Sequence, residues 1–532
     1  MARPSRPRRR RGPDRRTARA AAVRVPRPTV PVTRQQYDVL LDSFAHRHTG
    51  RHVEQVLWDW RGPLDTERFI SAWQSVTDRE AVLRAAVDWQ ADPRVDPPGP
   101  RIVLHDHARA DVVRHRAGTV DWEDLLERDR LRGFDLRRPA PLRLTLLDLP
   151  DDGTARPGGP LAVPPDAVPP DFALRDAAPA TRVLLTFHHA LLDPWSAFVL
   201  VEEFARAYLA GGVLPGGERR PDIRDRARWL ERQDHAAARD FFTRAVPPGR
   251  PVLLPALPGP ETRQSGCGRT EVRLSAAETG RLHHWAGTRA VPDSSVLHAV
   301  WALLLYRAAG SDGPVTVGFG VTASGRGIAL DAVERLVGPM RTVLPMALRV
   351  DPAHRLERLL TTLRDRALDM AAYEWASVGQ VRQWTGRTAG PELMESLVSV
   401  EAVPRPAADL RAGLSAAGIR FEGQRAGGAH TVFPLALLAH HLADGSLALS
   451  ALHDRARLSD ADAALLVAHC TRLLRHLPDT GESATVADVL AVLGTDRAPC
   501  AASGRRRERP VEWLRRHSTG GPSAVEGTAS EP

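Results

Sequence analysis

The sequence has little of what builds a disulfide framework, a zinc site or a membrane span. Its three cysteines, Cys267, Cys470 and Cys500, lie far apart with no C-x-x-C spacing, so neither a disulfide framework nor bound zinc is indicated. No apolar run approaches the roughly 20 residues that a membrane span needs. Lysine is absent and every basic residue is arginine, which together with abundant Ala, Gly and Pro is typical of a GC-rich genome. We therefore expect a globular protein of the cytoplasm, with no membrane partner.

The net charge of +9 comes from one end of the chain. Residues 1–28 hold eleven arginines and one aspartate, which leaves 62 of the 73 basic and 63 of the 64 acidic residues for the rest. A nucleic-acid-binding protein would carry the excess on its folded body, so we expect no nucleic-acid partner. The tail also lacks the apolar stretch of a secretory signal. We predict disordered tails at 1–29 and 496–532.

The chain is long enough for two subdomains, which we place at 30–212 and 213–495. The connector between them is rich in Arg and Asp and leads to a proline-rich linker that ends near residue 262. Strands and helices alternate in both halves, which indicates a mixed α/β (α+β) fold. The segment 150–180, rich in Pro, Gly and Asp, is interpreted as a surface insertion, or less favourably as a lid. Residues 404–432 are interpreted as a loop that crosses from one half to the other.

One segment concentrates residues with chemistry. A buried strand is predicted to end at the pair His188 and His189, Asp193 follows, and Ser196 is placed to cap a helix. A histidine at a strand end can take a proton from a nucleophile near neutral pH. Asp193 could orient the histidine, or it could pair with an arginine and brace the loop.

This segment, HHALLDPWS, resembles the HHxxxDG motif of the condensation domains of nonribosomal peptide synthetases, members of the chloramphenicol acetyltransferase-like superfamily. The resemblance implies that His189 is catalytic or positions the substrate, and that His188 and Asp193 hold the loop. Trp195 and Ser196 would support the site. The chain departs from the motif at Pro194, where the family has glycine, and a loop that needs glycine would lose activity.

Further segments resemble the same family. DREAVLRAAV keeps Glu80 and Arg84 of a family signature, and we expect Arg84 to play a structural role. The segment Ser324-Gly-Arg326 and the later VGPMRTVLP resemble the floor of the family's tunnel. We predict that Arg326 pairs with Asp193. Arg341 replaces the family's asparagine.

A second histidine pair does not fit the motif. His440-His441 is followed by Asp444 with one residue too few between them, inside two apolar runs that flank a turn signal. We interpret these histidines as strand residues of a hairpin.

The resemblance implies two chloramphenicol acetyltransferase-like subdomains in a V-shaped pseudo-dimer with a central tunnel. It implies a free-standing condensation enzyme that transfers an acyl or aminoacyl group from a carrier-protein thioester to an amine or hydroxyl. No metal and no cofactor would be bound by the chain, because phosphopantetheine arrives on the carrier. Expected partners are acyl or peptidyl carrier proteins or synthetase modules and a small-molecule acceptor, and the chain is expected to be a monomer.

Three alternatives remain open. A coenzyme A thioester could be the donor, as in other acyltransferases of the superfamily. Pro194 and Arg341 could mark a catalytically impaired scaffold that only binds carriers. Epimerization domains share the motif, but their glutamate-rich signature is not found.

Overall fold

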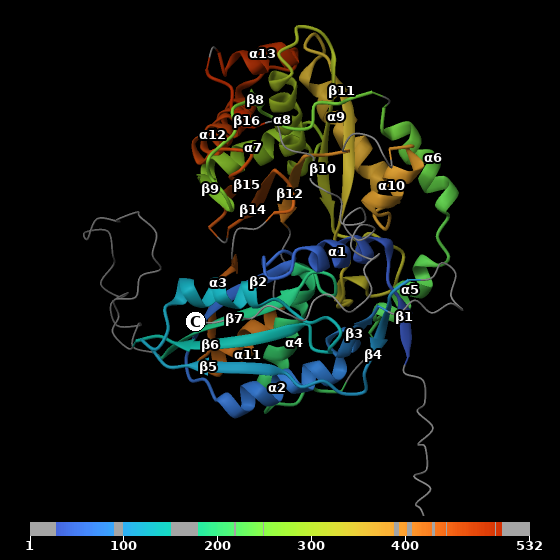
Figure 1. The fold of residues 1–532 in the computed structure, drawn as a ribbon. Coiled ribbons are helices and arrows are strands. Elements are labelled where there is room, and N and C mark those ends of the chain that lie inside the picture. The colour runs from blue at the N-terminus through green and yellow to red at the C-terminus, as the bar shows by residue number, and fades with distance from the viewer. Residues whose placement is uncertain are drawn as a thin grey trace, which may run out of the picture.

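The computed structural model describes residues 28–89, 99–150, 179–216, 220–247, 249–387, 393–401, 407–427, 431–442, 444–494 and 496–502. Its elements form two lobes, one above the other in Figure 1. Most of the predicted 150–180 insertion and most of both predicted tails lie outside the described residues. The mixed α/β character expected from the sequence is confirmed.

The first lobe is built on a five-stranded sheet in the order β13-β2-β7-β6-β5. These strands are β2 (Val53–Arg61), β5 (Asp111–His115), β6 (Leu142–Asp148), β7 (Ala180–His188) and β13 (Arg420–Gly427). Two helices, α2 (Thr66–Arg79) and α4 (Pro194–Leu209), contribute the aromatic rings that pack with Trp60 of β2. Within this sheet β6 pairs antiparallel with β7, the strand that ends at His188.

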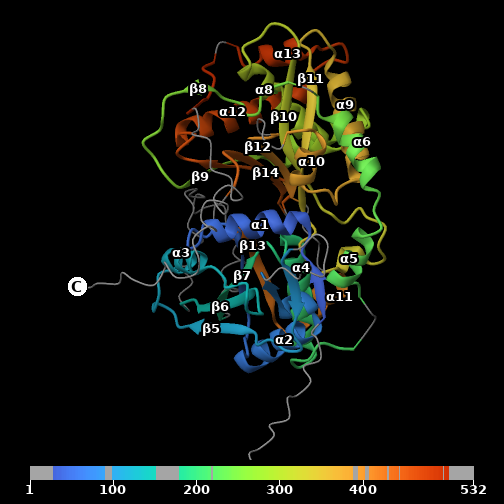
Figure 2. The ribbon, with the colours of Figure 1, turned by 45° about the vertical axis from the view of Figure 1, so that its right-hand side comes forward.

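Smaller elements complete this lobe. A three-stranded sheet is formed by β1 (Thr29–Pro31), β4 (Arg101–Leu104) and β3 (Ala85–Asp88), the last preceded by a 3-10 turn, η1 (Ala81–Arg84). The helices are α1 (Arg34–Ala45), α3 (Trp122–Arg132) and α5 (Ile223–Leu230). A capping box of Thr33 and Gln36 starts α1, which lies between the two lobes in both views (Figures 1 and 2).

The prediction that residues 404–432 cross from one half to the other is confirmed, but the prediction that they form a loop is wrong. This segment forms α11 (Ala408–Ala416) and then β13, which lie in the first lobe (Figure 2), and β13 pairs with β2 there. Leu410, Leu414 and Ile419 are buried in the core of that lobe, and the Phe421 ring lies 5.0 Å from that of Trp60. The burial of these apolar side chains offsets the cost of ordering a segment so distant in sequence.

The second lobe is built on a six-stranded sheet in the order β11-β10-β12-β14-β15-β9. The strands are β9 (Cys267–Leu274), β10 (Val315–Ala323), β11 (Thr342–Val350), β12 (Ser396–Glu401), β14 (Leu435–His441) and β15 (Leu447–Asp454). The helices are α6 (His235–Ala245), α7 (Ala276–Thr288), α8 (Asp293–Ala308), α9 (Leu356–Ala371), α10 (Val378–Trp384), α12 (Asp460–His476) and α13 (Val486–Ala491).

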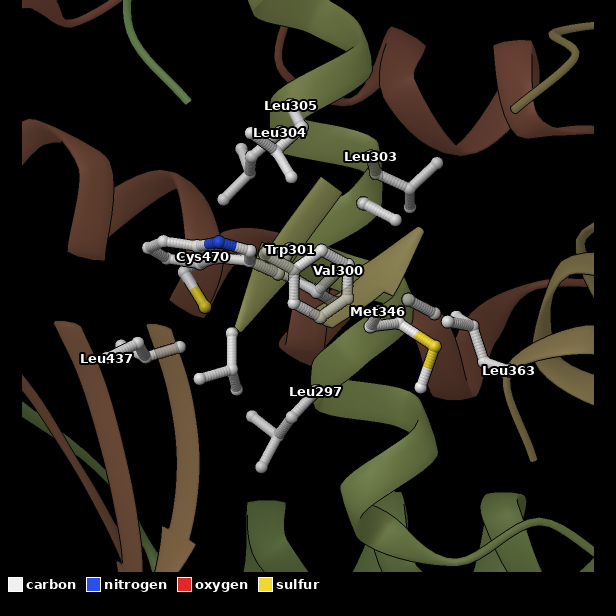
Figure 3. Packing of buried hydrophobic residues seen from close by; sticks show 14 of the residues in the cluster. Leu297, Val300, Trp301, Leu303, Leu304, Leu305, Met346, Leu363, Leu437 and Cys470 are labelled. Carbon is white, nitrogen blue, oxygen red and sulfur yellow. The ribbon is translucent and has the colours of Figure 1, made fainter. Parts of the chain in front are cut away.

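The centre of this lobe is α8, which is apolar on all sides. Val300 and Trp301 of α8 lie among Met346 of β11, Leu437 of β14 and Cys470 of α12 (Figure 3). A helix that is apolar all round must be buried, and here sheet and helices enclose it.

The C-terminal boundary also differs from the sequence prediction. Residues 496–502 are not part of a disordered tail, because β16 (Cys500–Ala502) pairs in parallel with β8 (Leu257–Gly259). Ala501 and Ala502 are buried there, and such small side chains gave no strong apolar signal in the sequence. In the part of the chain that the structure describes, no helix is both long and apolar enough to cross a membrane.

Candidate active site

His188 is the last residue of β7 and is fully buried. Its Nδ1 accepts the backbone N–H of Ala190 at 3.1 Å, so the ring proton lies on Nε2, which is 2.9 Å from the Ser43 hydroxyl of α1. Burial holds the pKa of His188 well below its ordinary value. The ring is therefore neutral and ties the strand end to α1.

His189 is held differently and is 23% exposed. Its backbone N–H donates to the His52 carbonyl at 2.8 Å, and its Nδ1 lies 3.2 Å from the Leu192 carbonyl. A carbonyl only accepts, so Nδ1 carries the hydrogen and the Nε2 lone pair of the neutral ring is left available. This tautomer can accept a proton from a bound nucleophile.

Asp193, not Ser196, caps the helix that follows. Its backbone is extended, and its carboxylate accepts the Ser196 N–H at 2.7 Å, which makes Pro194 the first helical residue. Proline is favoured at that position because its missing N–H would have no partner in the helix. An aspartate directly before a proline was the sequence signal for this earlier start. Pro194 thus occupies a helical position that favours proline.

The predicted Asp193–Arg326 pair is present and fully buried. The two guanidinium nitrogens of Arg326 lie 2.8 and 3.1 Å from the two carboxylate oxygens. The backbone N–H groups of Met340 and Arg341 donate to the same carboxylate at 3.0 Å each. Burial would raise the pKa of Asp193, but Arg326 and the Ser196 hydrogen bonds hold the pKa below its ordinary value. Because Arg326 follows β10, this pair joins the lobes.

The first turn of α4 makes further contacts with the second lobe. The Ser196 hydroxyl donates to the Gly338 carbonyl at 2.8 Å and accepts the Gly338 N–H at 3.0 Å. The Trp195 indole donates to the Glu334 carbonyl at 2.8 Å. Both side chains therefore fix the helix start against residues 334–338.

The loop that carries Arg326 is itself supported by Glu374, a buried carboxylate whose role the sequence did not reveal. Glu374 accepts the backbone N–H groups of Gly325, at 3.0 Å, and Gly327. Gly325 has φ of +69°, and a Cβ there would lie 1.9 Å from the Met340 carbonyl oxygen. Only glycine fits this close approach of two loops.

The side chains of two residues singled out in the sequence lie outside this group. The Arg84 guanidinium donates to the carbonyls of His105 at 2.6 Å and Asp106 at 3.3 Å, which braces the small sheet rather than the histidine loop. Arg341 contributes its backbone to Asp193, while its side chain donates to the Ser399 hydroxyl.

Sequence reasoning missed two neighbours of His189. His52, whose carbonyl holds the His189 backbone, has φ of +60° and its Nε2 lies 2.7 Å from an Asp42 carboxylate oxygen. Glu54 of β2 places a carboxylate oxygen 3.5 Å from His189 Nδ1. Neither is signalled by spacing, because the register of β2 against β7 brings them there.

Within the described ranges, no group of three or more His, Cys, Asp or Glu side chains is arranged to hold a metal ion. A hollow of about 990 Å³ lies beside β1, α2 and α5, and His189 does not line it.

Known proteins with similar sequences point to one family. The sequence model of the Condensation domain matches residues 172–484. One component of the linear gramicidin synthase of Brevibacillus parabrevis is 26% identical over 385 residues, which cover 70% of this chain and 4% of that protein. Chondramide synthase of Chondromyces crocatus is 28% identical over 66% of this chain and 8% of its own length. The chain thus spans a small part of these relatives.

A solved structure of similar fold is the starter condensation domain of rhizomide synthetase in complex with C8-CoA. It is 15% identical with a TM-score of 0.65 and covers 86% of this chain and 96% of its own. The match to the Condensation domain spans more than half of the chain, which therefore belongs to the condensation-domain family of nonribosomal peptide synthesis. Condensation domains are acyltransferase-type catalysts of amide-bond formation, and the two-lobed α/β fold is consistent with the chloramphenicol acetyltransferase-like fold.

Proposed function

We propose that this chain transfers an acyl or aminoacyl group from a carrier-protein phosphopantetheine thioester to an amine, or to a hydroxyl. The observation that carries this proposal is the hydrogen bond from His189 Nδ1 to the Leu192 carbonyl at 3.2 Å, which leaves Nε2 as a base. His188, Asp193 and Arg326 hold the loop in which His189 lies. That the chain acts as a free-standing enzyme stays a prediction.

The chemical step needs one base and two well-placed reactants. The acceptor nitrogen attacks the thioester carbonyl carbon, the carbon–sulfur bond breaks, and the amine proton passes through His189 Nε2 to the departing sulfur. Aminolysis of a thioester is downhill, so much of the rate can come from holding donor and acceptor together. The buried Asp193–Arg326 pair supports this by tying the histidine loop to the second lobe.

A second candidate donor is an acyl-coenzyme A. The similar starter condensation domain of rhizomide synthetase was solved with C8-CoA, which carries the same phosphopantetheine thioester. Both donors present the same thioester to the site. They differ in the part that must dock outside it, which is a carrier protein in one case and the rest of coenzyme A in the other. The scaffold alternative, which rests on Pro194 and Arg341, predicts carrier binding without turnover.

The deciding experiment offers both donors in one vessel. An acyl-loaded carrier protein and the matching acyl-coenzyme A, carrying different isotopes, are supplied with a panel of amines and alcohols. Mass spectrometry then reads which label enters the product, with His189→Ala as the control. Carrier label that disappears in the variant supports the proposal, whereas coenzyme A label favours the second donor. Carrier binding without product would favour a scaffold.

A further inference from the structure

Glu54 lies where a carboxylate can act on His189. It is paired with Phe187 in the register of β2 and β7, so both side chains belong to the same face of the sheet. Val56 and Trp58 follow on that face and are buried in the core, whereas the Glu54 side chain is 37% exposed. Glu54 thus stands where the apolar face ends and the histidine loop begins.

The geometry around His189 Nδ1 has two acceptors. The Leu192 carbonyl lies 3.2 Å away and accepts the hydrogen, and a Glu54 carboxylate oxygen lies 3.5 Å away. The carbonyl fixes the tautomer. The carboxylate adds a negative charge beside Nδ1. When Nε2 takes a proton, the ring becomes an imidazolium, and an opposite charge at this distance favours that protonated ring.

The other titratable groups near His189 do not supply this charge. Burial holds the pKa values of His52 and His188 below the ordinary value, so both rings are neutral near pH 7. Asp42 on α1 is engaged by His52 at 2.7 Å and Arg51 at 3.1 Å. Asp193 is neutralised by Arg326. Glu54 is therefore the carboxylate placed to act on the His189 ring.

We propose that Glu54 is a positioning residue that stabilises the protonated form of the His189 ring during the transfer step. The effect of Glu54 on turnover rests on the proposed function. The effect of Glu54 on the charge of the His189 ring does not, because it concerns the ring alone. No bond to Glu54 forms or breaks, and the proton stays on Nδ1 throughout.

The test uses the full chain and Glu54→Gln, which keeps the shape of the side chain and removes its charge. The His189 ring is titrated by NMR of ¹³C-labelled histidine, with its signal assigned by its absence in His189→Gln. Its titration midpoint should fall by about 0.5 to 1 unit in Glu54→Gln and remain close to wild type in Glu54→Asp. Turnover should fall roughly 3- to 10-fold in kcat with little change in KM, and its alkaline plateau should be reached at lower pH.

The matched control is Glu422→Gln. Glu422 is 44% exposed, lies on β13 beside β2, and pairs with Arg61 at 3.1 Å, at the far end of β2 from Glu54. It should leave both the titration and the pH profile unchanged. An unchanged His189 midpoint in Glu54→Gln would overturn the inference, as would a raised KM with an unchanged midpoint, which would make Glu54 a substrate contact. Absence of product in wild type would count against the proposed function alone, since the titration needs no substrate.

Discussion

The chain contains two histidine pairs followed by an aspartate, and the two segments fold differently. In the first, β7 ends at His188, three residues separate His189 from Asp193, and Asp193 caps α4 while it binds Arg326. In the second, His440 and His441 remain within the β14–β15 hairpin, as predicted from the sequence.

The aspartates make the contrast sharper. Asp444 is exposed and accepts the N–H and the hydroxyl of Ser446, at 2.9 and 2.5 Å, within the hairpin turn. Asp193 is buried and joins segments more than 130 residues apart. The aspartate lies at a helix start in the first segment and in a hairpin turn in the second, so the same residue types give a candidate site in one place and a turn in the other.

The largest expected effect is on turnover. Under the proposed function, His189→Ala should lower product formation about 10²- to 10⁴-fold, because it removes the proposed base. His441→Ala, which removes a half-exposed strand histidine, should leave turnover unchanged. Product is measured by mass spectrometry after circular dichroism has shown that both variants fold. Equal losses in the two variants would remove the functional distinction between the segments.

The next effect is on stability. Asp193→Asn leaves Arg326 buried without a carboxylate, and breaking a buried pair in this way costs about 3 to 5 kcal/mol. Urea unfolding of the variant should show this loss, and turnover should fall with it. Asp444→Asn is the control, and its unfolding curve should overlay that of wild type. A small loss in Asp193→Asn would mean that the pair does not hold the lobes together.

The pH dependence of that loss follows from the pKa of Asp193. The folded state holds this pKa below the ordinary value of 3.8, so the carboxylate contributes stability above pH 3.8 and loses it as pH falls through the lower, folded value. The difference in unfolding free energy between wild type and Asp193→Asn should therefore be full at pH 6 and shrink below pH 3.8. Urea unfolding at pH 6, 5, 4 and 3 measures it, and a gap that widens in acid would reverse the assignment.

The comparison also shows which features the sequence could predict. Local signals are readable in the sequence: Thr33 and Gln36 have the spacing of the capping box that starts α1, and His440 and His441 are strand residues as predicted. The Asp193–Arg326 pair came from a family resemblance that supplied a long-range contact. The Asp-Pro pair signals that Asp193 caps α4, a signal that the expectation of a Ser196 cap overlooks.

Long-range pairing was the part that could not be predicted. β13 joins β2 across more than 350 residues, with a register shift between Glu422 and Arg425, and no periodicity encodes that choice. Glu54 and His52 reach His189 only through the register of β2 and β7. Such contacts depend on which strands become neighbours, and a single sequence read alone does not indicate that choice.

The smallest expected effect concerns Pro194, where the first segment departs from the family motif. If the loop has adapted to proline, Pro194→Gly should cost about 1 kcal/mol by adding freedom to the unfolded chain, and turnover should not rise. Pro292→Gly, at the start of α8 and away from the histidine loop, should show a similar loss of stability with unchanged turnover. Thermal unfolding and product formation are measured for both. A gain in turnover confined to Pro194→Gly would show that proline impedes the loop, and the first segment would then be an impaired version of the site rather than an adapted one.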